Sequence, residues 1–146
     1  MKLQAIAILT FLIFENVMAQ ETTTTKYINS TDMEALKLTQ EWDKTFPQSD
    51  KVEHTKITFH NRYGITLAAD LYKPKNTQGR LAAIAVSGPY GAVKEQVSGR
   101  YAQTLAERGF LTVAFDPSFT GESGGQPRSV ASPDINTEDF SAAVDY

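Results

Sequence analysis

The chain has 146 residues, of which 41% are hydrophobic and 21% charged, as in an ordinary globular protein with at most one domain. Its formal net charge of -3 and the lack of a long basic run argue against a nucleic-acid partner. The sequence contains no cysteine, so a disulfide framework, a thiolate nucleophile and a lipid-modified cysteine are excluded within it.

Residues 1–19 have the features of a secretory signal peptide. Lys2 supplies a positive start, residues 3–14 are almost uninterruptedly apolar, and residues 17–19 are small or compact. A membrane span needs about 20 apolar residues, and Glu15 interrupts the run well before that length. We therefore predict cleavage after Ala19, export to a periplasm or the extracellular space, and no membrane span in the mature chain.

Residues 20–50 are predicted to form a polar spacer followed by an amphipathic helix. The spacer contains four consecutive threonines, and Thr31 followed by Glu34 is typical of a capping box at a helix start. Four apolar side chains then follow at roughly helical spacing: Met33, Leu38, Trp42 and Phe46. We expect this helix to end before Pro47 and to cover one edge of a sheet.

The domain predicted for residues 51–146 begins with an antiparallel hairpin. Residues 52–59 and 65–71 alternate with a period of two, and the loop between them contains Asn and Gly. The only two histidines of the sequence, His54 and His60, share one polar row of the first strand. This position favours surface histidines over catalytic ones.

A parallel β-α-β unit is predicted after the hairpin. Residues 81–86 and 110–115 are unbroken apolar runs typical of strands buried on both faces. Between them, an apolar stripe at helical spacing precedes Gly109; its members are Val97, Tyr101, Ala102, Leu105 and Ala106. A further helix is expected from Asn136, with Asp139 at its third position. We expect the last strand to carry an unpaired apolar edge.

The loop of residues 87–91, SGPYG, is the best candidate site. It lies at the carboxyl end of a predicted parallel strand, where α/β sheets bind ligands. It lacks the G-x-G-x-x-G spacing and the Walker lysine, which leaves phosphate or dinucleotide binding a weak second interpretation. A tight strand-to-helix turn that needs glycine only for its backbone is the structural alternative. Lys94, near this loop, is interpreted as a solvated charge.

The order of these elements, with the segments SGPYGAVKEQ, FLTVAFDPSFTGESGG and EDFSAAVDY, resembles the N-terminal portion of an α/β-hydrolase. The dienelactone-hydrolase-like and X-prolyl-peptidase-like branches are the most similar, and the resemblance covers about residues 51–146, the first half of that fold. It implies cleavage of a small-molecule ester, lactone or peptide-like bond by serine or cysteine acyl transfer. It also implies an oxyanion-hole N–H from Tyr90, with Gly91 as the second candidate.

Residues 121–125, GESGG, match the letters of the G-x-S-x-G nucleophile motif but not its context. A nucleophile elbow joins a strand directly to a helix, whereas residues 116–120 separate this motif from the preceding strand, and residues 126–128 follow it where a helix should begin. The triad histidine of this family follows its serine, and both histidines here precede every candidate serine. We therefore predict that no triad member is present. Five residues are assigned structural roles in loops: Gly88, Pro89, Asp116, Gly121 and Ser123.

No clustered His, Asp and Glu at metal-ligand spacing is found, and neither a metal nor a cofactor is predicted. Two functional hypotheses remain. The first is an exported α/β-hydrolase truncated before its nucleophile elbow, inactive and marginally stable as an isolated chain. The second is a non-catalytic exported binding or interaction module, completed through its open sheet edge by self-association or by another chain.

Overall fold

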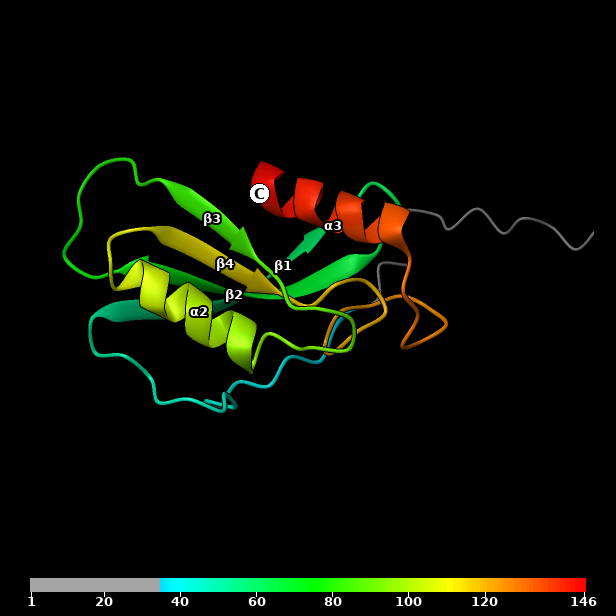
Figure 1. Cartoon of the computed structure of the whole chain (residues 1–146), viewed down its shortest axis with the longest axis horizontal. Helices are drawn as coiled ribbons and strands as arrows, with labels where there is room; N and C mark the ends of the chain where they lie inside the picture. Colours follow the sequence, from blue (N-terminus) through cyan, green and yellow to red (C-terminus); the bar gives the residue numbers. More distant parts are fainter. Residues whose placement is uncertain (1–34) are drawn as a thin grey trace, which may run out of the picture. The chain divides into compact units, whose positions relative to one another are not determined.

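The computed structural model describes residues 35–146 as a mixed sheet with one helix on each face (Figure 1). The predicted signal peptide, the polar spacer and the start of the predicted N-terminal helix lie outside the described residues. In chain order the elements are β1 (Val52–His60), β2 (Thr66–Pro74), β3 (Ala83–Val86), α2 (Val97–Ala106), β4 (Leu111–Phe115) and α3 (Pro133–Asp145). The predicted α/β fold class is confirmed.

The predicted hairpin forms over the full length of both strands. β1 and β2 pair antiparallel from Val52 opposite Pro74 to His60 opposite Thr66. The Asn61 side chain shapes the turn, because its Oδ1 accepts hydrogen bonds from the N–H groups of Tyr63 and Ile65, each at 3.0 Å.

The strand order is β1-β2-β4-β3, which corrects the expectation about the open edge. β4 pairs antiparallel with β2 and parallel with β3, so the last strand of the sequence lies inside the sheet. The crossover through α2 carries the chain past β3 and inserts β4 between β2 and β3. The two edge strands of the described sheet are therefore β1 and β3, and β3 is the edge on the parallel side.

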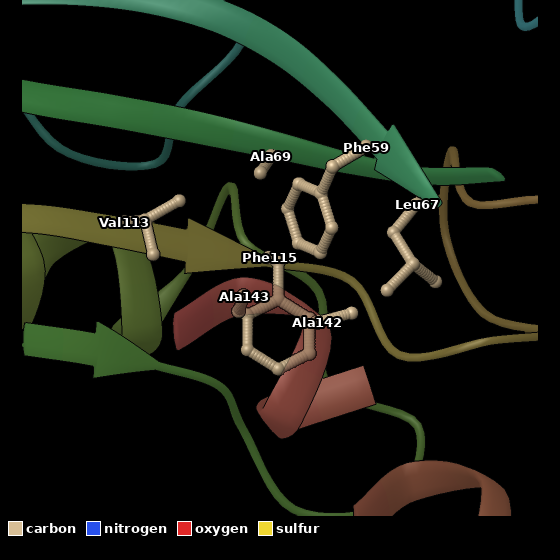
Figure 2. Close-up of a cluster of buried hydrophobic side chains, with 7 residues drawn as sticks. All are labelled: Phe59, Leu67, Ala69, Val113, Phe115, Ala142 and Ala143. Atoms are coloured by element: carbon tan, nitrogen blue, oxygen red, sulfur yellow. The ribbon is translucent and has the colours of Figure 1, made fainter. Parts of the chain in front are cut away.

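Alternate residues of β4 contribute to two cores on opposite faces of the sheet. Val113 and Phe115 point to the α3 side, where they pack with Phe59 and Leu67 (Figure 2). Ala114 points to the α2 side, in a second core that includes Ala102 and Ala106 of α2, Tyr72 of β2, and Phe46. The sheet is therefore covered on both sides, as a sheet with parallel pairing requires.

The helix predicted to run through residues 35–46 does not form; this part of the chain is irregular. Its backbone is used in tertiary contacts instead. The N–H of Thr39 donates to Glu122 Oε1 at 2.8 Å, and the N–H of Thr45 donates to the Glu95 carbonyl at 2.9 Å. Trp42 does pack, as expected, because its ring lies edge-on to Phe46 with centroids 5.6 Å apart. These tertiary contacts outweigh the weak helical periodicity of the segment.

Both helices differ in detail from the sequence prediction. In α2 the buried face consists of Ser98, Gly99, Ala102, Gln103 and Ala106, whereas Val97 and Tyr101 are 81% and 59% exposed. A Cβ on Gly99 would lie 2.1 Å from the Lys94 carbonyl oxygen, so this position has no room for a side chain and requires glycine. α3 begins at Pro133 after Ser132, three residues before the predicted start.

None of the helices described over residues 35–146 combines the length and apolar character needed to cross a membrane.

Candidate functional site

The candidate site begins with the turn after β3. The N–H of Ala92 donates to the Pro89 carbonyl at 2.9 Å, and Gly91 adopts φ +79°, a conformation that glycine adopts without strain. Ser87 anchors the start of the turn by donating from Oγ to the Phe115 carbonyl at 3.1 Å. Within residues 35–146, the backbone N–H groups of Tyr90 and Gly91 donate to no acceptor. This turn can therefore offer two hydrogen-bond donors to a ligand.

The Tyr90 side chain connects this turn to the loop after β4. It is 69% exposed, and its hydroxyl donates to the Ser129 carbonyl at 2.7 Å. Ser129 is held in turn by its own N–H, which donates to the Phe119 carbonyl at 2.8 Å. Two loops that follow neighbouring parallel strands thus share one rim of the site.

Asp116 lies beneath both loops and is completely buried. Its carboxylate accepts hydrogen bonds from the Lys94 N–H at 2.7 Å, the Lys94 ammonium at 2.9 Å and the Glu122 N–H at 2.9 Å. Gly121 passes so close that a Cβ there would lie 2.2 Å from Asp116 Oδ2. Asp116 orders the two loops, and its oxygens are committed to donors of the protein itself.

Ser123 occupies an interior position and is only 2% exposed. Its hydroxyl donates to the Asp116 carbonyl at 2.6 Å and accepts from the Ala68 N–H at 2.9 Å. The guanidinium of Arg128 closes the loop around it by donating to the Gly121 carbonyl at 2.6 Å and to the Ser123 carbonyl. A serine held in this way is not presented to a substrate as a nucleophile elbow requires.

The interpretation of Lys94 as a solvated charge is wrong. Its side chain is completely buried, and its ammonium contacts Asp116 at 2.9 Å, Glu122 at 2.8 Å and Glu95. Burial by itself would lower the pKa of Lys94, but these three carboxylates raise it above its ordinary value. The sequence gives no signal for this role, because Asp116 and Glu122 lie 22 and 28 residues away along the chain.

Lys94 is part of a larger network that the sequence did not reveal. Seven charged residues alternate in sign along a continuous series of ion pairs, which we call the ion chain: Asp70, Lys44, Asp43, Lys56, Glu122, Lys94 and Asp116. The ion chain draws on β1, β2, residues 43–44 and both loops of the site. One sequence signal was available, since Asp70 interrupts an otherwise apolar stretch of β2.

The carboxylates of Asp43, Glu95 and Glu122 lie within 4.8 Å of one another, a grouping that could suit a metal ion. The Lys56 ammonium lies between them, 2.9 Å from Asp43 Oδ2, 2.9 Å from Glu122 Oε2 and 4.0 Å from Glu95 Oε1. The Lys94 ammonium also contacts Glu122 and Glu95. The residues present therefore do not fit a cation, because lysine side chains already occupy that place and compensate the charge.

The two histidines occupy different environments. His60 is exposed as predicted, with Nδ1 3.1 Å from Thr66 Oγ1. The prediction is wrong for His54, whose side chain is only 14% exposed and whose Nε2 lies 2.7 Å from Asp70 Oδ1. The His54 ring packs between Trp42 and Tyr72, each with its centroid 5.1 Å away. In the part of the chain that the structure describes, neither ring contacts a serine hydroxyl.

The stability of the described domain should fall in acid. Burial alone would raise the pKa values of Asp43 and Glu122, but hydrogen bonds from lysine ammonium groups lower both to about 2, from 3.8 and 4.5. The folded state therefore binds fewer protons than the unfolded chain below about pH 5, and the stability from these groups is lost as the pH drops towards 2. Urea midpoints measured across this range should decline, and Glu122→Gln should decline less because one titrating group is gone. An equally steep decline in the variant would contradict this assignment.

Comparisons with known proteins agree with this architecture. Residues 63–146, more than half of the chain, match the family model "X-Pro dipeptidyl-peptidase (S15 family)". The uncharacterized protein PA2218 of Pseudomonas aeruginosa is 74% identical over 125 residues, covering 85% of this chain and 33% of that protein. The uncharacterized protein YcjY of Escherichia coli is 48% identical over 97 residues, covering 64% of this chain and 32% of that protein.

Solved structures show the same fold. The crystal structure of hypothetical protein PA2218 superposes with a TM-score of 0.75 at 79% identity, covering 77% of this chain and 35% of that one. The α/β-hydrolase GrgF from Penicillium sp. sh18 superposes with a TM-score of 0.56 at 26% identity, covering 64% and 31%. The chain spans about a third of the length of these relatives. It belongs to the X-Pro dipeptidyl-peptidase (S15) family and has the α/β-hydrolase fold that its sequence resembles.

Proposed function

We propose that this chain is the N-terminal portion of an exported hydrolase that cleaves an ester, lactone or peptide-like bond by acyl transfer. The observation that carries the proposal is the turn at the carboxyl end of β3, where the Tyr90 and Gly91 N–H groups have no acceptor within the described residues. In an α/β-hydrolase fold this is the position of an oxyanion-hole donor. The predicted signal peptide supports export.

The chemistry assigned to this turn is stabilisation of negative charge. A serine or cysteine nucleophile attacks the substrate carbonyl carbon, and the π electrons of the carbonyl move onto its oxygen. The N–H of Tyr90, or that of Gly91, donates to this oxyanion, which is worth roughly 3 kcal/mol per donor. When the carbonyl re-forms, the alcohol or amine leaves with a proton from a general acid, and water then hydrolyses the acyl-enzyme.

We assign the nucleophile, acid and base to chain beyond Tyr146. Ser123 is buried with both hydrogen-bonding functions of its hydroxyl in use, and His54 contacts Asp70. The open edge of β3 offers a place for further strands, beside an apolar groove of about 200 Å³. Residues of three strands and of α3 line this groove, among them Ile84, Val113 and Val144.

A fluorophosphonate probe, which labels activated serines, tests the assignment. Applied to the 146-residue chain it should give no adduct, and applied to the product of the full reading frame it should label a serine beyond Tyr146. Ser123→Ala should leave labelling of the longer protein in place. It should also reduce the unfolding free energy by about 1–3 kcal/mol, because the Ala68 N–H loses its acceptor inside the protein. An adduct at Ser123 that disappears in Ser123→Ala would overturn the proposal.

A second candidate function is a non-catalytic exported interaction module. Two observations favour it: the unpaired edge of β3, and the large exposed side chains of Val97 and Tyr101, which line a groove with Val86 at the end of that strand. Size-exclusion chromatography and hydrogen exchange separate the two functions. A stable oligomer with protected β3 amides favours the module, whereas a loosely folded monomer favours the hydrolase portion.

A further inference from the structure

Residues 39–46, which we call the strap, lie outside the part of the chain that matches the family model. They have no regular secondary structure, yet they contact the sheet and both loops of the candidate site. We propose that the strap holds these two loops in their site-forming conformation and that Asp43 is a positioning residue for the Tyr90–Gly91 turn. This inference rests on the proposed function only in taking the Tyr90–Gly91 turn to be an oxyanion hole.

The strap is anchored to the sheet by buried groups. The Lys44 side chain is completely buried, and its ammonium lies 3.0 Å from Asp70 Oδ2 in β2. Phe46 is 5% exposed in the core beneath α2, and the Trp42 indole N–H donates to the Phe46 carbonyl at 2.8 Å. These groups fix both ends of the segment that carries Asp43, so its carboxylate has a defined position.

The strap contacts the loop that carries the Tyr90–Gly91 turn. The Thr45 N–H donates to the Glu95 carbonyl at 2.9 Å, and the Thr45 hydroxyl contacts the same oxygen at 3.3 Å. Glu95 directly follows Lys94, whose N–H is held by Asp116. The C-terminal side of the turn is therefore fixed from two directions, by the strap and by Asp116.

The strap also contacts the loop after β4. The Thr39 N–H donates to Glu122 Oε1 at 2.8 Å. Asp43 Oδ2 lies 2.9 Å from the Lys56 ammonium, which in turn lies 2.9 Å from Glu122 Oε2. The other oxygen of Asp43, Oδ1, lies 2.5 Å from the Lys44 ammonium. Asp43 is thus the anion between two lysines, and without it each ammonium group loses one of its carboxylate partners.

The loss of Asp43 should therefore weaken the anchoring of both site loops as well as that of the strap. Lys44 would keep Asp70 and Lys56 would keep Glu122, so the sheet retains its partners. The strap, however, would lose its ionic connection to Lys56 and Glu122, and mutual repulsion of the two ammonium groups would favour its release. Glu95 and Glu122 would then lose the backbone donors that the strap supplies.

Hydrogen–deuterium exchange of the 146-residue chain tests this without a substrate. In Asp43→Asn, the hydrogen-bonded amides within residues 87–96 and 117–125, among them Ala92, Lys94 and Glu122, should exchange at least tenfold faster, equivalent to about 1.4 kcal/mol of local opening. The centres of β2 and β4 should keep their protection. Asp50→Asn, at an exposed aspartate near the strap, is the matched control and should leave every rate unchanged.

Two further variants distinguish positioning from a general loss of packing. Asp43→Glu keeps the anion and should restore most of the protection in both loops. Thr39→Pro removes the N–H that binds Glu122, and Thr39→Ala controls for loss of the threonine side chain. Exchange in residues 117–125 should accelerate in the first variant and not in the second; this pair remains informative even if Asp43→Asn unfolds. Faster exchange confined to the strap, with both loops unchanged, would overturn the inference. Failure of the acyl-transfer proposal would leave these exchange rates as expected, so the two outcomes are distinguishable.

Discussion

Asp116→Ala should lower the free energy of unfolding of the 146-residue chain by about 3–5 kcal/mol, the cost typical of removing one partner from a buried ion pair. The Lys94 ammonium would stay buried but would lose one of its three carboxylate partners. The N–H groups of Lys94 and Glu122 would also lose their acceptor in the interior. Urea titration followed by far-UV circular dichroism measures the change; if the parent has less stability than this, the variant will be unfolded without urea.

The control for Asp116→Ala is Asp50→Ala, at an exposed aspartate, which should change the unfolding free energy by less than about 0.5 kcal/mol. A double-mutant cycle with Lys94→Met isolates the ion pair. The double variant should lose at least about 1 kcal/mol less than the sum of the two single variants, because neither residue then leaves an unpaired buried charge. If the effects of the two single variants simply add, Asp116 stabilises the fold only by accepting hydrogen bonds from the Lys94 and Glu122 N–H groups.

The sequence predicted the parts of the fold that depend on local patterns. The period of two in β1 and β2, with Asn61 and Gly64 between them, specified the hairpin and its turn. The apolar runs specified β3 and β4 as parallel strands. β4 is buried as predicted, whereas β3 is an edge strand of the described sheet and only partly buried, which corrects the expectation that both its faces are covered. The turn after β3 was also predicted, because Gly88 and Gly91 directly follow the apolar run of that strand.

The sequence could not predict features that depend on pairing between distant segments. Asp43, Lys56, Lys94 and Glu122 each have the appearance of an ordinary surface charge, and only the fold brings them together. The face of α2 was assigned by hydrophobicity, but the buried face includes Gly99, whose backbone lies against the Lys94 carbonyl, and Val97 and Tyr101 lie outside it. The irregular strap stands in place of the predicted helix because its hydrogen-bond partners, Glu95 and Glu122, are far away in the sequence.

Asp139 was singled out in the sequence as a residue near a helix start, but the structure gives it a different role, as a buried acceptor. It was predicted as the third residue of a helix beginning at Asn136, but α3 begins at Pro133 and Asp139 lies in its interior turns, completely buried. Its Oδ1 accepts from the Asn61 amide and the Ser118 hydroxyl, each at 2.8 Å, and its Oδ2 accepts from the Ser118 N–H at 2.8 Å. The carboxylate therefore joins α3 to the hairpin turn and to the loop after β4.

Asp139→Ala should lower the free energy of unfolding by about 3 kcal/mol or more, because three buried donors lose one anionic acceptor. Asn61 is 5% and Ser118 1% exposed, so solvent does not readily replace it. The matched control is Asp145→Ala, at an exposed aspartate in the last turn of the same helix. Removing that charge should be neutral or slightly stabilising, since an anion near a helix C-terminus is unfavourable.

Asp139→Asn refines the test, because asparagine keeps one acceptor oxygen but turns an amide donor towards groups that are themselves donors. We expect an unfolding free energy between those of the parent and Asp139→Ala. Hydrogen exchange should locate the damage in residues 61–65 and 117–120, where the Asn61 turn and Ser118 depend on this carboxylate. If Asp139→Ala were as stable as Asp145→Ala, the junction of α3 with the hairpin would have to be held by its other contacts, which are the Arg62–Glu138 pair and the apolar packing of Phe59 and Ala142.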